Sequence, residues 1–423
     1  MEHSFDIVVT GKVNKVVSHS DYLVKETLTH VKQWGDTGGL KEVNLSGCKL
    51  LESLPADETR AFAKVESFDF GNCSALTQVS AGLFAAAESA KNFNSVFANS
   101  TALETIPAKL FANCAAATGF SHAFSECTSL KAVPDSLFAG CVKAKSFKDA
   151  FYKCSSLEGV GQGVFAGCSA AEDFESTFNR CTSLKSLPER LFADCVNALK
   201  YPYTFNECSS LTPLPAKMFA NNKNVTSFST CFVKTGLAAL PEDLFAECVK
   251  AKNFESCFRE CPIDSIPGKL FAACTEATSF SYAFYQCEAL KELPEDLFAT
   301  CTKVTDFGMV FYMCKSMTAI PEGLFAACTE VTSFSHAFKS CTALTTVPVG
   351  IFDNNRKVKS FSQTFHNCSS WAGESPYTEI EGVKYHLYER ANNFTEFVKP
   401  GGSYCFEKCS KLTDYKSIPS DWK

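Results

Sequence analysis

Residues 111–138 read FANCAAATGFSHAFSECTSLKAVPDSLF, and this stretch contains one full unit of the repeat that decides the fold. It ends in the dipeptide Leu-Phe, which recurs, in this or a closely related form, along most of the chain. The phenylalanines of this dipeptide are residues 84, 111, 138, 165, 192, 219, 245, 271, 298, 325 and 352, spaced by 27 residues except for two spacings of 26. We number each of the eleven repeats from this phenylalanine, which is position 0. A fixed period of this length is typical of solenoid proteins, whose units stack on one another.

Two further columns of the repeat are aromatic. Position 9 is phenylalanine in ten repeats and Tyr201 in the other, and position 13 is phenylalanine in all eleven. The three columns hold 32 of the 39 phenylalanines. Apolar rings that recur at fixed positions are best explained by burial against their counterparts in neighbouring repeats. We therefore expect three stacked aromatic rows in the core.

The spacing within a repeat favours short helices. A proline stands at position −4 in nine repeats, and Pro-x-x-Leu-Phe-x-x-Cys places apolar groups on one face of a two-turn helix. Residues 280–287 have the same apolar spacing, and position 8 before such runs is usually Ser, Asp or Asn, which cap helices. Residues 130–134 and 331–333 suit short strands of a parallel ladder. The sequence thus predicts an α/β repeat solenoid of the leucine-rich-repeat kind, with two short helices and one or two short parallel strands per 27-residue repeat.

The ends of the chain differ from the repeats. Residues 5–10 read as a strand, and the alternating residues 381–389 read as a hairpin strand. We expect four segments: an N-terminal cap at 1–38, the solenoid at 39–369, a polar, tyrosine-rich insertion at 370–404, and a terminal half repeat at 405–423.

Composition and charge exclude several classes of protein. The net charge is −6 and no basic cluster is present, so we expect no nucleic-acid partner. No apolar run is long enough to span a membrane, and we expect no membrane insertion. Residues 1–20 lack the apolar core of a signal peptide. The chain is thus expected at the cell surface or secreted if an export signal has been removed, and inside the cell otherwise.

All 23 cysteines fall at positions 3, 12 and 16, or at the equivalent positions of the end repeats, on the apolar face. One interpretation is that they are small buried apolar residues with reduced thiols. The other is a disulfide between positions 3 and 16, because eight repeats have cysteine at both. Cys48, Cys73, Cys368 and Cys409 have no partner in that scheme, so we expect reduced thiols. Long rows without local histidines do not resemble a zinc site.

No pattern in the sequence indicates catalysis. None of the seven histidines pairs with Ser or Cys and a carboxylate in a pattern that repeats or stands apart in the sequence, and no phosphate loop, dinucleotide fingerprint or metalloprotease motif is present. We expect no catalytic residue, no cofactor and no bound metal.

The variable columns are more informative about binding. Positions 11, 14 and 15 differ from repeat to repeat, so we expect them to face outwards. In three successive repeats they carry aromatic, thioether and imidazole groups: Tyr282, Tyr285, Met309, Tyr312, Met313 and His336. Stacking brings such residues together, and we expect an exposed contact surface for a protein or glycan ligand. The alternative is surface aromatic residues with no common role.

The motifs resemble those of a known family. Phe-x-x-Cys-Thr-Ser-Leu-x-x-Val-Pro at Phe124 to Pro134, and Val-Thr-x-Phe-x-x-x-Phe at Val304 to Phe311, are similar to the BspA-like leucine-rich-repeat surface proteins of bacteria. The resemblance covers about residues 40–368 and the last 18 residues. It implies a non-enzymatic binding or adhesion module of a bacterial surface protein, without shared catalytic residues. The alternative hypothesis is a structural or receptor-binding component of a phage tail or similar particle.

Overall fold

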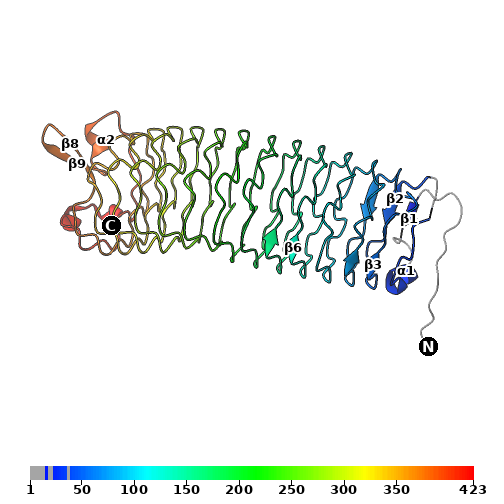
Figure 1. Ribbon diagram of the computed structural model, residues 1–423. Coiled ribbons are helices and arrows are strands. Elements are labelled where there is room, and N and C mark those ends of the chain that lie inside the picture. Colours follow the sequence, from blue (N-terminus) through cyan, green and yellow to red (C-terminus); the bar gives the residue numbers. More distant parts are fainter. Residues whose placement is uncertain (1–14, 18–21, 36–38) are drawn as a thin grey trace. The chain divides into compact units, whose positions relative to one another are not determined.

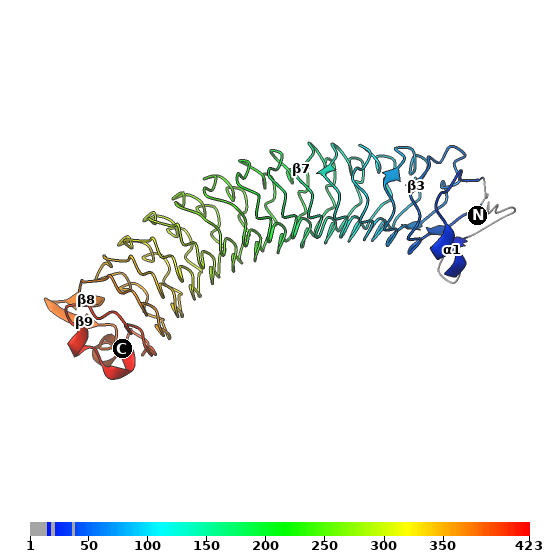
Figure 2. The same ribbon diagram turned by 90° about the horizontal axis from the view of Figure 1, so that it is seen from below.

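A computed structural model describes residues 15–17, 22–35 and 39–423 (Figure 1). The strand expected at residues 5–10 lies outside this part of the chain. The structure divides into two compact units, Met1–Ala198 and Leu199–Lys423, which we call unit 1 and unit 2. Within each unit, successive repeats form coils that lie side by side, as both views show (Figures 1 and 2).

Unit 1 contains short parallel strands and one helix in its described part. They are β1 (Lys15–Val17), α1 (Tyr22–Thr27), β2 (Glu42–Asn44), β3 (Ser53–Leu54), β4 (Ser67–Asp69), β5 (Gln78–Val79), β6 (Ala132–Val133) and β7 (Gly159–Val160). The pairs β1–β2, β2–β4, β3–β5 and β6–β7 are all parallel. Strand β1 thus pairs with the first leucine-rich segment, next to the repeats.

Two parallel ladders join successive repeats. At position 8, single bridges link residues such as Asn92 to Gly119 and Ser279 to Asp306. At position −6, β6 pairs with β7, and Ser265 bridges Glu292 in unit 2. The partners are 26 or 27 residues apart, as the sequence spacing requires. The predicted short parallel strands are therefore present, in most repeats as single bridges.

The two helices predicted for each repeat are not present in the described residues. The segment from position 9 to position 16 is a series of turns. In the repeat of Phe271, the amides of Ala283 and Tyr285 donate to Phe280 and Tyr282, three residues back. The alternate amides donate instead to the next repeat: Tyr282 to the carbonyl of Gly308 (2.8 Å), and Phe284 to that of Val310 (2.9 Å).

Left-handed backbone at two positions explains why the second of the two predicted helices, at positions 9–16, does not form. Positions 11 and 15 have positive φ in every repeat, for example 58° at Tyr282 and 56° at Gln286. An α-helix needs consecutive right-handed residues, so the chain leaves that conformation every fourth residue. The capping chemistry at position 8 is nevertheless real, because Ser279 Oγ accepts a hydrogen bond from the amide of Ser281. It opens a turn rather than a helix.

The three aromatic columns form the core, as predicted. Every ring at positions 0, 9 and 13 is at most 1% exposed. Within each unit, neighbours in a column stack with centroids between 5.2 Å, as for Phe254 and Phe280, and 6.2 Å, as for Phe325 and Phe352. Rings of positions 0 and 9 meet edge to face, for example Phe271 and Phe280 at 4.7 Å. Both arrangements suit the aromatic quadrupole.

The cysteines line this core as buried hydrogen-bond donors. All 23 are free and buried. The thiol at position 16 contacts the carbonyl of position 13 in the preceding repeat, as Cys287 does with Phe258 (3.2 Å) and Cys341 with Phe311 (3.1 Å). Such contacts help to satisfy carbonyls that would otherwise lose hydrogen bonds on burial. The expectation that the cysteines are buried is confirmed, and that of reduced thiols stays a prediction.

Unit 2 ends in a segment with its own elements. They are β8 (Tyr377–Ile380), β9 (Val383–His386), α2 (Arg390–Asn393) and the 3₁₀ turns η1 (Tyr415–Ser417) and η2 (Ser420–Trp422). Strands β8 and β9 form the antiparallel hairpin drawn in orange in Figure 1, so the predicted hairpin strand is confirmed. Arg390 of α2 is buried and donates to the carbonyl of Phe352 (2.9 Å). One coil earlier, the side-chain amide of Asn355 donates to the backbone carbonyl of Phe325 in the same way.

The last residues close the aromatic rows. Residue 402 takes position 9 of the terminal half repeat but is glycine, and a Cβ there would lie 2.1 Å from the ring of Trp422. The indole instead packs on Phe406 (6.3 Å) and Phe361 (6.4 Å). The amide of Phe406 donates to the carbonyl of Trp422 (2.8 Å), where a further coil would otherwise supply the acceptor. Residues from both ends of the half repeat thus cap the core.

Candidate functional site

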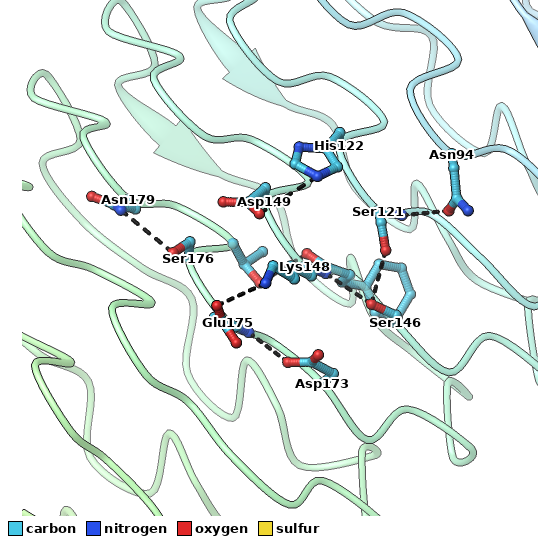
Figure 3. Close-up of polar contacts among 12 residues, drawn as sticks. Asn94, Ser121, His122, Ser146, Lys148, Asp149, Asp173, Glu175, Ser176 and Asn179 are labelled. Atoms are coloured by element: carbon cyan, nitrogen blue, oxygen red, sulfur yellow. Dashed lines mark hydrogen bonds and ion pairs between the residues drawn. The ribbon is translucent and has the colours of Figure 1, made fainter.

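Positions 10, 11, 14 and 15 lie in the series of turns that runs from position 9 to position 16. Their side chains form columns along successive coils. In unit 1 these columns are polar and charged (Figure 3). Lys148 pairs with Glu175 at 2.8 Å, and His122 lies 3.7 Å from Asp149 in the next repeat. Burial raises the pKa of the Asp149 carboxyl. These contacts join neighbouring repeats.

In unit 2 the same columns become aromatic. We call Tyr282, Tyr285, Met309, Tyr312, Met313 and His336 the aromatic patch. The interrepeat hydrogen bonds hold them in register: the amide of Tyr282 donates to Gly308, that of Met309 to Ser335, and that of Gln286 to Tyr312. Side chains at equal positions therefore lie one coil apart. The structure brings the six predicted residues together on three successive coils.

Position 14 forms a continuous stack. Tyr285 and Tyr312 are parallel, with centroids 4.8 Å apart and planes inclined by 10°. The guanidinium of Arg259, one repeat earlier, lies 4.8 Å from the Tyr285 ring, and the ammonium of Lys339, one repeat later, lies 5.8 Å from the Tyr312 ring. Cation–π attraction and ring stacking both stabilise this order.

The patch is less exposed than expected. All six side chains are half-buried, whereas Tyr404 at position 11 of the terminal half repeat is 53% exposed. Stacking along a column covers ring faces, because Tyr285 and Tyr312 on successive coils are only 4.8 Å apart, little more than the thickness of one ring. Burial raises the pKa of Tyr285, and the nearby Tyr312 hydroxyl adds to this effect. The six side chains were expected to be exposed, and in the structure they are only partly so.

His336 lies beside basic neighbours. Its Nδ1 is 2.9 Å from Ser335 Oγ. Burial lowers the pKa of His336, and Lys339 and His366 lower it further. The imidazole is thus kept uncharged at neutral pH, and it adds a polar edge to the patch rather than a cation.

Sequence reasoning missed Arg259, Lys339 and Gln286. Arg259 and Lys339 complete the position 14 stack at its two ends. The amide of Gln286 lies 3.4 Å from the sulfur of Met313. The signal was present, because position 14 reads Arg, Tyr, Tyr, Lys in successive repeats. Tracing single columns, rather than selecting aromatic residues, would have found it.

A Ser–His–Asp cluster occurs in the C-terminal segment. Ser375 Oγ lies 2.8 Å from His386 Nδ1 and donates to Asp414 Oδ2. The carboxylate therefore receives the serine proton directly, whereas a catalytic triad orients the histidine with its carboxylate. Ser375 is fully buried, and its amide also donates to Asp414 (3.1 Å). This arrangement ties the start of the insertion to residue 414.

The thiols have the properties of inert core groups. Desolvation raises the pKa of Cys127 to about 12 and that of Cys261 to about 11. Reactive thiols need a lowered pKa, so these side chains are poor nucleophiles. Within the described ranges, no group of three or more His, Cys, Asp and Glu side chains is placed to hold a metal ion. None of the helices in the described part has the length and apolar composition that a membrane crossing requires.

Comparison with solved structures finds similar chains at low sequence identity. The match to a chain of the Toll–Spätzle complex of Drosophila has 17% identity and a TM-score of 0.50, and covers 82% of this chain and 42% of that one. The present chain thus spans less than half of its length. A leucine-rich repeat protein from Bacteroides ovatus matches with 17% identity, a TM-score of 0.31, and coverage of 86% and 89%. A leucine rich cell surface protein from Faecalibacterium prausnitzii matches with 16% identity, a TM-score of 0.24, and coverage of 74% and 82%.

Comparison of sequences gives the family. No curated protein matches the chain. The model of the BspA type leucine rich repeat region, in six copies, matches residues 39–226, 131–278, 205–332 and 238–372. These matches together cover the part of the chain in which the phenylalanine columns form the stacked coils. The chain therefore belongs to the family of BspA-type leucine-rich-repeat proteins.

Proposed function

We propose that this chain is a non-enzymatic binding or adhesion module of a bacterial surface protein, and that the aromatic patch of unit 2 contacts its ligand, a protein or a glycan. The single observation that supports this proposal is the change of the outward columns. In unit 1 these columns include interrepeat ion pairs. In the two repeats that begin at Phe271 and Phe298, no residue at positions 10, 11, 14 and 15 is charged. Tyrosine and methionine are enriched, and charged residues depleted, in the centres of protein contacts.

The other tyrosine-rich segment is a weaker candidate. In the insertion, Tyr388 stacks on His386 (5.3 Å), and Tyr385 meets Phe394 edge to face (4.8 Å). Tyr377 lies under the ammonium of Lys384 (4.5 Å). These rings pack within the segment itself, which favours the aromatic patch as the ligand-binding surface.

A binding screen tests the proposal. The chain is immobilised and exposed to a panel of purified host matrix proteins and surface glycans, in parallel with a variant carrying Tyr282→Ser, Tyr285→Ser and Tyr312→Ser. We expect at least one ligand to bind the parent, with at least tenfold weaker binding to the variant. A second variant changes three exposed residues of position 4 in the same repeats, Thr275→Ala, Thr302→Ala and Thr329→Ala, and should bind like the parent. Equal binding by the tyrosine variant would exclude the patch as the contact surface.

A further inference from the structure

The position 14 stack covers the faces of its own rings. Tyr285 has Arg259 from the preceding repeat on one side and Tyr312 from the following repeat on the other. Tyr312 in turn lies between Tyr285 and Lys339. Because the coils are held in register by the amide ladder, neither ring can turn a face outwards without breaking a stack and a cation–π contact.

What remains accessible is the rim of each ring. The edge of an aromatic ring carries positive partial charge, and its face carries negative partial charge. A sugar packs its C–H groups on an open aromatic face, and that face is occupied in both residues. The edges of Tyr285 and Tyr312 and their phenolic hydroxyls can still contact acceptors. The half-buried thioethers of Met309 and Met313 supply the adjacent apolar area.

The charges near the patch also favour a ligand that carries hydrogen-bond acceptors. Arg259 is neutralised by Glu260, with Nη2 and Oε1 2.9 Å apart. Lys339 donates to the amide oxygen of Gln363. In the described part of the chain, Lys339 forms no ion pair with a carboxylate. The chain as a whole is nevertheless acidic, with a net charge of −6. Lys339 is thus a cation free to pair with an incoming carboxylate.

We propose that the aromatic patch binds an acidic segment of a protein partner, with a carboxylate on Lys339 and further oxygen acceptors at the rims of Tyr285 and Tyr312, and that it does not bind sugar rings. This inference rests on the proposed function, because it takes the patch as the contact surface and assigns the class of ligand. Electrostatic complementarity at such a site mainly sets specificity and the rate of association.

Defined probes test the inference. The full chain is titrated with a fluorescent peptide of alternating Glu and Leu, with a Lys and Leu peptide of equal length, and with chitohexaose and xylohexaose. We expect saturable binding of the Glu peptide that weakens with added salt, and no binding of the Lys peptide or of either hexasaccharide. Lys339→Gln should weaken the Glu peptide at least tenfold, and Tyr312→Phe severalfold through the lost hydroxyl. Lys315→Gln, which removes an exposed lysine paired with Glu288, is the matched control and should bind like the parent.

The outcomes separate this inference from the proposed function. A hexasaccharide that binds the parent and not the Tyr285→Ser, Tyr312→Ser variant would overturn the inference but support the patch as a contact surface. Glu peptide binding that is unchanged in Lys339→Gln, or absent from the parent, would also overturn the inference. The proposed function fails only if the tyrosine variant retains every ligand found in the screen.

Discussion

At the scale of single residues, Phe284 and Tyr285 are neighbours in sequence with different surroundings. Phe284 is fully buried and stacks on Phe258 (5.5 Å) and Phe311 (5.6 Å). Tyr285 is half-buried and lies in the surface stack of position 14. The turn geometry sends Phe284 into the core and Tyr285 towards the outer surface of the coil.

Replacing these two residues should therefore have unequal effects on stability. Phe284→Ala removes a ring from a packed row and should lower the free energy of unfolding by about 3–5 kcal/mol. Tyr285→Ala loses one stacking and one cation–π contact at a partly solvated site, and should cost ~1–2 kcal/mol. Urea unfolding followed by circular dichroism measures both. Similar losses for the two variants would contradict this assignment of inside and outside.

At the scale of elements, the aromatic rows of unit 2 end at η2, where Trp422 replaces the ring that position 9 of the terminal half repeat lacks. Trp422 of η2 occupies the space that a phenylalanine at position 9 fills in the other repeats, and Gly402 leaves room for it. The carbonyls of Asp421 and Trp422 accept hydrogen bonds from Tyr404 and Phe406. The cap thus uses both the side chain and the backbone of residues 421–422, which contact residues 402–406.

A compensating pair of substitutions tests this cap. Trp422→Ala should leave a cavity and cost about 3–5 kcal/mol, and Gly402→Phe alone should be destabilising because its ring would overlap the indole. Together they restore phenylalanine at position 9, so the double variant should be more stable than either single one. A double-mutant cycle from thermal unfolding gives the coupling energy. Additive losses would mean that the two positions do not share one space.

The repeat shows what could and could not be predicted from the sequence. The three phenylalanine columns and the parallel ladders followed from spacing alone. The prediction of helices was wrong because apolar residues at intervals of three and four suit an α-helix and a series of turns equally well. Only the backbone at residues such as His122 and Tyr282, with φ of 57° and 58°, distinguishes the two. Likewise, the sequence placed the six patch residues near one another, but not the ring stacking that covers their faces.

At the scale of the whole molecule, the buried thiols make stability depend on pH. Burial raises thiol pKa values from the ordinary 9.0, to about 12 for Cys114 and Cys127. Below pH 9 the thiols are protonated in both the folded and the unfolded state. Between pH 9 and about 12 only the unfolded state loses these protons, so it is favoured as the pH rises. Each such thiol should lower the free energy of unfolding by ~1.4 kcal/mol per pH unit in this window.

We therefore expect the unfolding midpoint to be constant from pH 7 to 8.5 and to fall steeply above pH 9, in the presence of reductant. Lysines and tyrosines also titrate in this range, so a variant is needed to isolate the thiols. Position 12 is alanine in several repeats, and Cys231→Ala with Cys257→Ala should fold and show a shallower fall. Thiol counting should detect few groups in the native protein and 23 in denaturant. A midpoint that is equal at pH 7 and pH 10 would refute the assignment.

The left-handed residues described above have a consequence for how such a chain folds. Each coil holds non-glycine residues at positive φ, such as Asp149 and Lys153, and each costs on the order of 1 kcal/mol or more. The amides that offset this cost donate to the neighbouring coil, so an isolated coil has the strain without the compensation. Forming the first pair of coils is therefore the rare event, and adding each later coil to an existing pair is favourable. Partly folded chains should consist of contiguous blocks of coils, rather than of scattered ones.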